Sequence, residues 1–319
     1  MVDGGSQQTW PGRLRAAFVS HAAGISPGSP VPPIARPAYA LQALFAGVVL
    51  AGVAATDFTL GSGPLASGLY LLLWLALAAP LARRYGMRRA ALFMESVSFA
   101  PLGGLLTVCA TIMVASISED FADDWLIRSD QALGFDWLAA YKFSRSYPTV
   151  VRVLNFAYWS MDPQIVLVPL ALALTRQERT MWVFFTAWLI ALMATALIFP
   201  LAPARGAAIH FGLTPDSLSK DWFWQFGPRI ESLRHGAGRD ISSMAMGIVS
   251  VPSFHAAAAV MFTWAGRSLP YLSWPIAALN LLMVISTPIS GIHYLVDVLA
   301  GVLVGAVAIA AARMMAARD

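Results

Sequence analysis

The chain has 319 residues, of which 58% are hydrophobic and only 12% are charged. Soluble domains carry about 25% charged residues, so the composition excludes an ordinary soluble domain and indicates a membrane protein with several spans. The net charge of +4 comes from dispersed arginines rather than from one basic patch, which argues against a nucleic-acid partner.

The N-terminal region differs from the rest of the chain. Residues 1–36 are polar and rich in Pro, Gly and Ser, which predicts a disordered cytoplasmic tail. They contain no apolar core followed by a cleavage site, so the run that starts near Ala38 is expected to be an uncleaved anchor. Residues 37–319 are expected to form one membrane-embedded domain, with its core at about 90–313. The single cysteine, Cys109, cannot form an intrachain disulfide.

The apolar runs predict an all-α bundle. A span needs about 20 mainly apolar residues, and the hydropathy pattern predicts about eight transmembrane helices. They are expected at residues 38–56, 65–82, 94–117, 153–174, 181–200, 252–267, 272–290 and 293–313. Gly301 and Gly305 in the last run form a small-xxx-small pair, which we interpret as a helix-packing surface.

The arginines predict the orientation. They lie at every second junction between the runs, namely Arg13, Arg15, Arg36, Arg83, Arg84, Arg88, Arg89, Arg176, Arg179, Arg267, Arg313 and Arg318. By the positive-inside rule this side is cytoplasmic, so both termini are expected inside. We expect an integral protein of a bacterial-type inner membrane.

The opposite side receives the longer connections. Residues 118–152 combine acids with Trp and Tyr, a pattern typical of short helices at the membrane interface. The loop 201–251 holds an aromatic cluster at residues 222–226, followed by Arg229, Arg234 and Arg239, which suggests either a lid or an interfacial platform.

Four polar residues stand out against this apolar background. His293 and Asp297 are four residues apart at the start of the last run, a spacing that puts both side chains on one helix face. His255 opens the sixth run, and Arg205 follows the fifth. Ionisable residues there are costly and indicate a functional site, although a histidine satisfied by a local carboxylate and an interfacial arginine are the structural alternatives. The topology brings all four to the extracytoplasmic end.

An anion-binding site is expected at this end. Pro252 suits the first turn of a helix, where the backbone amides of Ser253 and Phe254 would point outward with the positive end of the helix dipole. Arg205 adds a planar fork of donors that suits phosphate.

The remaining three residues fit acid–base and covalent chemistry. Asp297 behind His293 would fix the imidazole tautomer, which makes His293 a nucleophile or a base, and His255 is a second proton carrier. Together with the anion site they indicate phosphoryl transfer through a phosphohistidine.

Two other interpretations stay open. The same residues could hold a metal, although no further Asp, Glu or His cluster accompanies them, or they could be the proton relay of a proton-coupled transporter. We expect no metal and no other cofactor. Asp162 precedes a proline and is interpreted as part of a helix kink rather than of the site, and Glu95 at a span edge is expected to face water.

At these residues the sequence resembles the type 2 phosphatidic acid phosphatase superfamily. The motifs of that family are Lys-x6-Arg-Pro, Pro-Ser-Gly-His and Ser-Arg-x5-His-x3-Asp. Residues 252–255 (Pro-Ser-Phe-His) resemble the second motif, and residues 286–297 resemble the third with its spacing intact. The first motif is reduced to two prolines and an arginine within residues 200–205.

The departures from these motifs point to one branch. Phe254 replaces glycine, Thr287 replaces the third-motif arginine, and Ile198 holds the place of the first-motif lysine. The inositolphosphorylceramide synthase-like, or inositolphosphotransferase, branch commonly shows such forms, and residues 130–137 also look like that branch.

The resemblance covers about residues 125–305 and implies a six-helix core with additional N-terminal helices and a metal-independent enzyme. It implies His293 as the nucleophile, Asp297 as its orienting partner and His255 as the acid that protonates the leaving oxygen. Phosphate would be held by Arg205 and by the amides of Ser253 and Phe254.

This sequence lacks the first-motif lysine and the third-motif arginine. Their absence implies a substrate phosphate with less negative charge, such as a phosphodiester. Alternatively, Arg229, Arg234 or Arg239 replaces the missing charge, with His210 as a weaker candidate, or the site is unreactive. We expect transfer of the phosphate-bearing head group of a phospholipid or sphingolipid to an alcohol acceptor. The alternative is hydrolysis by water, as in a phosphatidic acid or polyprenyl phosphate phosphatase.

Overall fold

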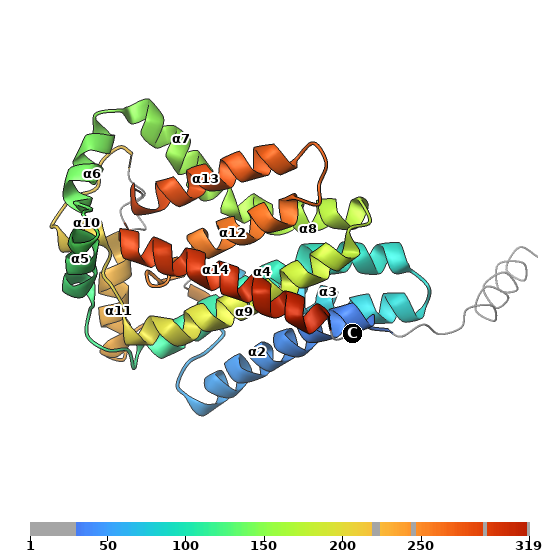
Figure 1. Ribbon diagram of the computed structural model, residues 1–319. Coiled ribbons are helices and arrows are strands. Elements are labelled where there is room, and N and C mark those ends of the chain that lie inside the picture. Colours follow the sequence, from blue (N-terminus) through green and yellow to red (C-terminus); the bar gives the residue numbers. More distant parts are fainter. Residues whose placement is uncertain (1–29, 219–223, 244–246, 290–291, 318–319) are drawn as a thin grey trace, which may run out of the picture.

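A computed structural model describes residues 30–218, 224–243, 247–289 and 292–317. Within these ranges the chain is helical and forms no strand, which confirms the all-α class. The principal helices are α2 (Arg36–Ala55), α3 (Pro64–Arg84), α4 (Arg88–Ala115), α7 (Pro148–Trp159), α8 (Met161–Leu174), α9 (Glu178–Ile198), α12 (Phe254–Gly266), α13 (Ser273–Ile289) and α14 (Leu295–Ala316) (Figure 1). Residues 1–29 of the predicted tail lie outside the described residues, and a 3₁₀ turn, η1 (Pro33–Ala35), leads into α2.

Helix α12 lies inside the bundle, where it packs against α8, α9, α13 and α14 (Figure 1). Small side chains make this position possible, because residues 256–259 are consecutive alanines. The approach of α14 depends on glycine: a Cβ atom on Gly305 would lie 2.7 Å from the carbonyl oxygen of Ala257, and one on Gly301 would collide with the carbonyl oxygen of Ser253. The structure confirms the glycine pair as a packing surface.

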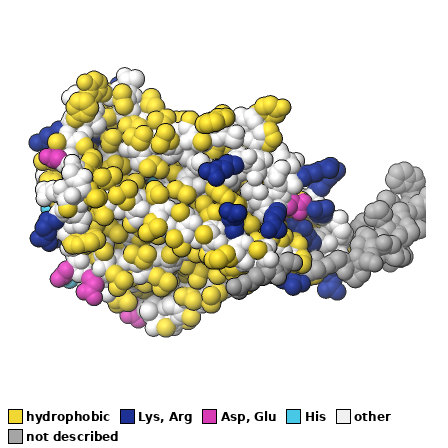
Figure 2. Space-filling model, viewed as in Figure 1, with side chains coloured by type: hydrophobic (Ala, Val, Ile, Leu, Met, Phe, Trp, Pro, Cys, Tyr) yellow, Lys and Arg dark blue, Asp and Glu magenta, His cyan; other side chains and the backbone are white. Residues whose placement is uncertain are grey.

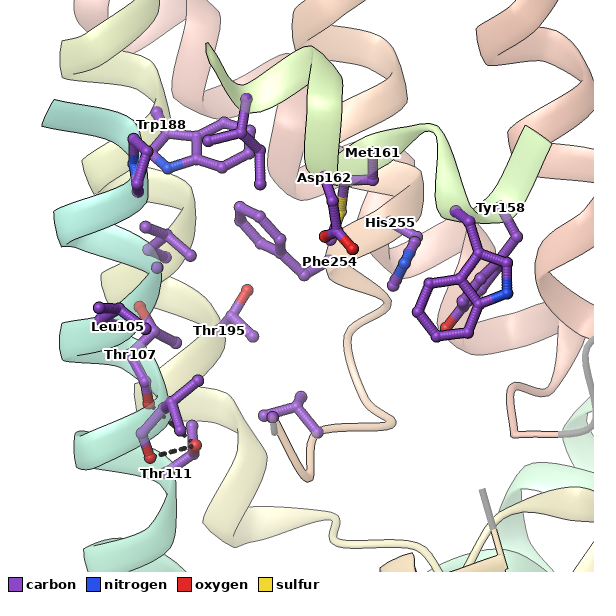
Figure 3. Close-up of a pocket in the computed structure, with 18 of the residues that line it drawn as sticks. Leu105, Thr107, Thr111, Tyr158, Met161, Asp162, Trp188, Thr195, Phe254 and His255 are labelled. Atoms are coloured by element: carbon purple, nitrogen blue, oxygen red, sulfur yellow. Dashed lines mark hydrogen bonds between the residues drawn. The ribbon is translucent and has the colours of Figure 1, made fainter. Parts of the chain in front are cut away.

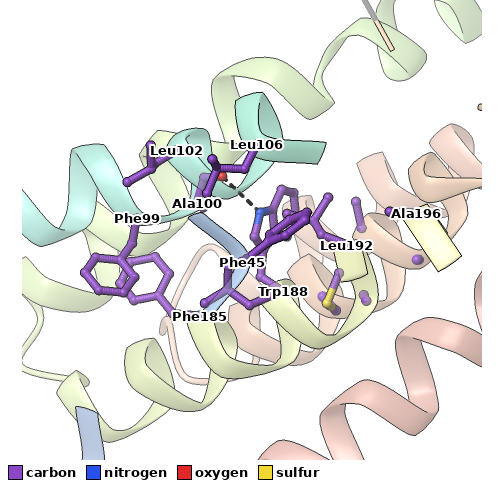
Figure 4. Close-up of a cluster of buried hydrophobic side chains, with 14 of the residues drawn as sticks. Phe45, Phe99, Ala100, Leu102, Leu106, Phe185, Trp188, Leu192 and Ala196 are labelled. Atoms are coloured by element: carbon purple, nitrogen blue, oxygen red, sulfur yellow. Dashed lines mark hydrogen bonds between the residues drawn. The ribbon is translucent and has the colours of Figure 1, made fainter. Parts of the chain in front are cut away.

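An aromatic core joins α2, α4 and α9 (Figure 4). Phe99 of α4 packs against Phe185 of α9 with ring centroids 5.3 Å apart, and Phe45 of α2 reaches the same cluster. The Trp188 Nε1–H donates to the carbonyl oxygen of Ala100 at 3.1 Å, so the polar edge of this buried indole is satisfied.

Fewer helices than predicted are long enough to cross a membrane. Five helices in the described residues are long and apolar enough, or six if α7 and α8, bent by 49°, count as one span. Helix α12 has 13 residues and α13 has 17, which corresponds to about 20 and 25 Å against an apolar core of about 30 Å. The count of eight was therefore too high by this measure, because burial within the protein also produces apolar runs.

Charge and apolar surface separate along the bundle. Hydrophobic side chains cover most of the visible flank, and charged side chains gather toward its two ends (Figure 2). At one end lie the short helices α5 (Asp123–Ala132), α6 (Trp137–Arg145), α10 (Ala207–His210) and α11 (Phe226–Arg234). The short helices expected within 118–152 are thus present, as α5 and α6.

The prediction that Glu95 faces water was wrong. Its carboxylate is fully buried, accepts hydrogen bonds from Arg83 Nε and the Tyr39 hydroxyl, both at 2.9 Å, and forms an ion pair with the Arg83 guanidinium. These partners come from α3 and α2, so the charge is compensated inside the bundle and ties the first two helices to α4.

Candidate active site

His293 and Asp297 are in contact, but not on one face of a helix. Helix α14 begins only at Leu295, so His293 lies in the segment that enters it and Asp297 lies in its first turn. Nδ1 of His293 is 3.2 Å from Oδ2 of Asp297. An ionised carboxylate only accepts hydrogen bonds, so Nδ1 carries the proton and Nε2 is left with a free lone pair.

The Asp297 carboxylate is fully buried. Its Oδ2 also accepts hydrogen bonds from the Ser250 hydroxyl at 2.9 Å and from the Tyr294 amide at 3.0 Å. Its Oδ1 is buried without a hydrogen-bond partner in the described part of the chain. The carboxylate that contacts the His293 ring is therefore held in place by two further hydrogen bonds.

His255 approaches from the opposite side. It lies in the first turn of α12, after the N-cap residue Ser253, and its ring stacks on Tyr158 of α7 with centroids 3.9 Å apart. The centroids of the His255 and His293 rings are 6.3 Å apart. One phosphoryl-sized group can therefore contact both rings.

Both histidines line a cavity of about 600 Å³ within the bundle. Figure 3 shows His255 in its wall, beside Tyr158 and Asp162. Helices α3, α4, α7, α8, α9 and α12 contribute to its wall, together with Phe226 of α11, Gly247, Val249 and Ile292. The lining is mainly apolar, interrupted by hydroxyl groups of three threonines and by Asp162. No lysine or arginine is among the described lining residues. The structure shows both a bend between α7 and α8 and Asp162 at the cavity, so this residue belongs to the kink and to the site.

Asp123 holds the loops that carry the site. It is 2% exposed and opens α5. Its carboxylate accepts hydrogen bonds from the Tyr294 hydroxyl at 2.7 Å and from the amides of Arg205 at 3.0 Å and Gly206 at 3.3 Å. Burial and the neighbouring Asp123 carboxylate raise the pKa of the Tyr294 phenol, which stays a donor.

Asp130, about two turns further along α5, holds the start of α14. Its two oxygens accept hydrogen bonds from the amides of Leu295 and Val296, each at 2.9 Å. These amides belong to the positive end of the helix, where a carboxylate is stabilising. Burial raises the pKa of the Asp130 carboxyl, and the two amides oppose that shift.

Trp137, at the start of α6, fixes the segment that carries His293. Its indole N–H donates to the carbonyl oxygen of His293 at 2.9 Å and to that of Pro288 at 3.1 Å. The sequence analysis did not assign Asp123, Asp130, Trp137 or Ser250 to the site. The resemblance of residues 130–137 to one branch was the only signal that pointed to two of them.

Arg205 was expected to bind phosphate, but its guanidinium lies elsewhere. It donates to Glu231 Oε1 at 3.0 Å and stacks over the Phe121 ring at 4.3 Å. It is not among the residues that line the cavity. The reason is local competition, because a carboxylate and an aromatic face on the same side of the protein satisfy the guanidinium.

The other candidate cations also lie outside the cavity lining. Arg234 donates to the Ser118 hydroxyl at 3.1 Å, and Arg239 stacks over Phe58 at 4.7 Å. His210 faces Asp124 at 3.5 Å. Arg229 lies on α11, and its side chain is not part of the lining either.

The anion-binding site expected from the backbone amides of Ser253 and Phe254 is only partly present. The Ser253 amide donates to the backbone oxygen of Asp297 at 3.0 Å, so it is not available to a phosphate, and the Ser253 hydroxyl caps α12 by accepting from the Ala256 amide. Phe254 lines the cavity. Thr287, in the place of the third-motif arginine, is buried and donates to the carbonyl oxygen of Met283.

The positions of these side chains also bear on the alternative that the site holds a metal ion. Among the described residues, no group of three or more His, Cys, Asp or Glu side chains is arranged to hold a metal ion. His255, His293 and Asp297 thus do not form such a group, because Asp297 is turned to Nδ1 of His293 and is shared with Ser250.

The fold and the site define an integral membrane protein of the helical-bundle class, with two histidines and a carboxylate beside an apolar cavity. The family model of the PAP2 superfamily matches residues 124–311, more than half of the chain, and the protein belongs to this superfamily. Membership makes it a lipid enzyme of the phosphatase or phosphotransferase type. The comparison with curated proteins and the comparison with solved structures each gave no match.

Proposed function

We propose that this protein transfers the phosphate-bearing head group of a lipid to an alcohol through a covalent phosphohistidine on His293. The observation that carries the proposal is the buried contact of His293 with Asp297, opposite His255 at the edge of the cavity. Nε2 of His293 attacks phosphorus, the bond from phosphorus to the leaving oxygen breaks, and His255 gives that oxygen its proton. The acceptor hydroxyl then attacks phosphorus, the N–P bond breaks, and His255 takes the hydroxyl proton.

The donor is a phosphodiester. A monoester carries close to two negative charges and is usually matched by several cations, whereas the described lining of this cavity contains no lysine or arginine. Arg205 and Arg234 have protein partners instead. The low positive charge supports a donor with a single negative charge, and the apolar walls suit its hydrocarbon part.

An alcohol acceptor is favoured over water. The cavity carries hydroxyl groups from Thr107, Thr111 and Thr195, and the Thr195 hydroxyl is buried without a partner in the described residues. A buried hydroxyl of this kind is satisfied when it binds a polar group of a substrate. The branch resemblance supports inositol or a ceramide or diacylglycerol hydroxyl as the acceptor. Hydrolysis, as in a lipid phosphate phosphatase, is the second candidate, and a proton-coupled transporter has no support from the family.

The proposed site is on the extracytoplasmic face, with both termini in the cytoplasm and no metal required. Arginines lie at the ends of α3, α8 and α12, at the end of the bundle opposite the site, and their position supports this orientation.

The deciding experiment measures the products. The purified protein is incubated with a phosphodiester phospholipid, with and without inositol, ceramide or diacylglycerol, and the lipids are analysed by mass spectrometry. A new phosphodiester formed only with the alcohol supports the transferase. Diacylglycerol and the phosphorylated head group, formed at the same rate with and without an alcohol, would overturn the transferase in favour of hydrolysis.

The covalent step is tested on the nucleophile. For His293→Ala we expect at least a ~10³-fold loss of rate and no acid-labile phosphohistidine, because no other group takes the phosphoryl from the donor. His235→Ala is the matched control, since His235 is exposed and lies outside the cavity lining. Full turnover in His293→Ala would refute the covalent mechanism.

A further inference from the structure

A second cavity lies at the opposite end of the bundle. Its volume is about 860 Å³, and four arginines line it: Arg88, Arg89, Arg176 and Arg179. We call this cavity the arginine groove. It lies where α4 begins and where the turn from α8 to α9 packs beside it. It is separate from the catalytic cavity and shares no lining residue with it.

The groove has a strong positive charge. Among the described lining residues Glu178 is the only acidic one, and its carboxylate pairs with Arg88 at 2.7 Å, so the lining combines four arginines with one carboxylate. Arg179 also donates from Nη2 to the carbonyl oxygen of Ala316 at 3.5 Å. Two long helices also begin here, α4 at Arg88 and α9 at Glu178, and neither has a side-chain hydrogen bond at its N-cap. Their N-terminal dipoles add to the positive potential. Lys and Arg side chains gather at this end of the molecule with few acidic side chains among them (Figure 2).

One of the arginines is placed at a conformational cost. Arg176 has a φ angle of 61°, in the left-handed region that glycine adopts most easily, at the C-terminal end of α8. An arginine in this position puts a guanidinium at the groove where a glycine would fit the turn better. The residue type is therefore explained by the groove rather than by the turn.

The rest of the groove is apolar and opens onto the flank of the bundle. Leu92, Phe93, Leu170 and Leu174 line it, and Phe93 and Leu174 are 55% and 76% exposed. Guanidinium groups beside exposed apolar side chains match a ligand that has an anionic head and hydrocarbon chains.

From these observations we propose that the arginine groove is a binding site for the head group of an anionic phospholipid, with the acyl chains along the exposed face of α4 and α8. This site is distinct from the reaction site and does not depend on the proposed reaction. A head-group phosphate accepts hydrogen bonds from two or more of the guanidinium groups, and the acyl chains cover Phe93 and Leu174.

The test is a lipid titration of the purified full-length protein by native mass spectrometry. Phosphatidylglycerol is compared with phosphatidylcholine of the same acyl chains, and we expect the wild type to retain phosphatidylglycerol more tightly. Arg176→Gly is the most informative variant, because glycine suits the turn. It should bind phosphatidylglycerol about fivefold more weakly, leave phosphatidylcholine unchanged and keep its melting temperature.

A matched pair of triple variants separates the groove from overall charge. Arg89, Arg176 and Arg179, all changed to Gln, should weaken phosphatidylglycerol binding by about a hundredfold. Arg36, Arg84 and Arg267, changed to Gln, remove the same charge from exposed positions outside the groove and should weaken it less than about twofold.

Three results would overturn the proposal. They are an equal loss in both triple variants, equal binding of the two lipids by the wild type, and displacement of the lipid by glycerol 3-phosphate at a similar concentration. The last result would indicate a site for a soluble anion.

Discussion

The two ends of the bundle use charged side chains in opposite ways. At the site end, Asp123, Asp130 and Asp297 are at most 2% exposed, and each accepts a hydrogen bond from a backbone amide. At the other end the arginine groove is open, and its Arg88 side chain is 69% exposed although it pairs with Glu178. The buried acids fix backbone positions, whereas the exposed arginines create a potential that attracts anions. The same type of change should therefore have a large effect at one end and a small effect at the other.

The largest effect is expected at Asp297. In Asp297→Asn the side chain keeps its size, but the imidazole loses the acceptor that fixes its tautomer and the charge that stabilises its cation. In a comparable carboxylate–histidine pair such a change lowers kcat by about 10⁴-fold, and we expect a loss of ~10³-fold or more. The measurement is the initial rate of head-group transfer. Asp124→Asn, at a 79% exposed position, is the control, and a loss of less than tenfold in Asp297→Asn would contradict the assigned role.

An intermediate effect is expected at Asp130. In Asp130→Asn one acceptor oxygen becomes a donor that faces a backbone amide of α14, so at least one charge-assisted hydrogen bond is lost. The cost is about 1.5–3 kcal/mol of stability, seen as a lower melting temperature. Asp136→Asn is matched to it, because Asp136 caps α6 through the Ala139 amide and asparagine caps equally well. Equal melting temperatures of the two variants would mean that Asp130 does not anchor α14.

The smallest effect is expected at Glu178. In Glu178→Gln the arginine groove loses the one acidic residue of its described lining, and Arg88 loses its carboxylate partner. Exposed pairs contribute about 0–1 kcal/mol, so the melting temperature should hardly change, while phosphatidylglycerol binding should become slightly tighter. A clear loss of stability would break the contrast between the two ends, and weaker lipid binding would contradict the electrostatic role of the groove.

The sequence and the structure agree best where an interaction is local. His293 and Asp297 could be paired from their spacing alone, although the contact is made across the start of α14 rather than along a helix face. The placement of His255 opposite them followed from the alternation of apolar runs. Arg205 shows the limit: its position after the fifth run was identified, but the direction of its guanidinium depends on Glu231, 26 residues further along the chain.

Composition and apolar periodicity by themselves determined that this is an all-α membrane protein, and motif spacing singled out the two histidines and the carboxylate of the candidate site. Both are properties of short stretches, which one sequence displays directly. Only the tertiary structure decided how many helices are long enough to span, that Glu95 is compensated by Arg83 and Tyr39, and that Asp130 holds an amide 165 residues away. It also brought the four arginines of the groove together from two separate turns. The physical reason is that a buried polar group needs hydrogen-bond or ionic partners. Tertiary packing brings these partners together from distant parts of the chain, so a local sequence pattern does not identify them.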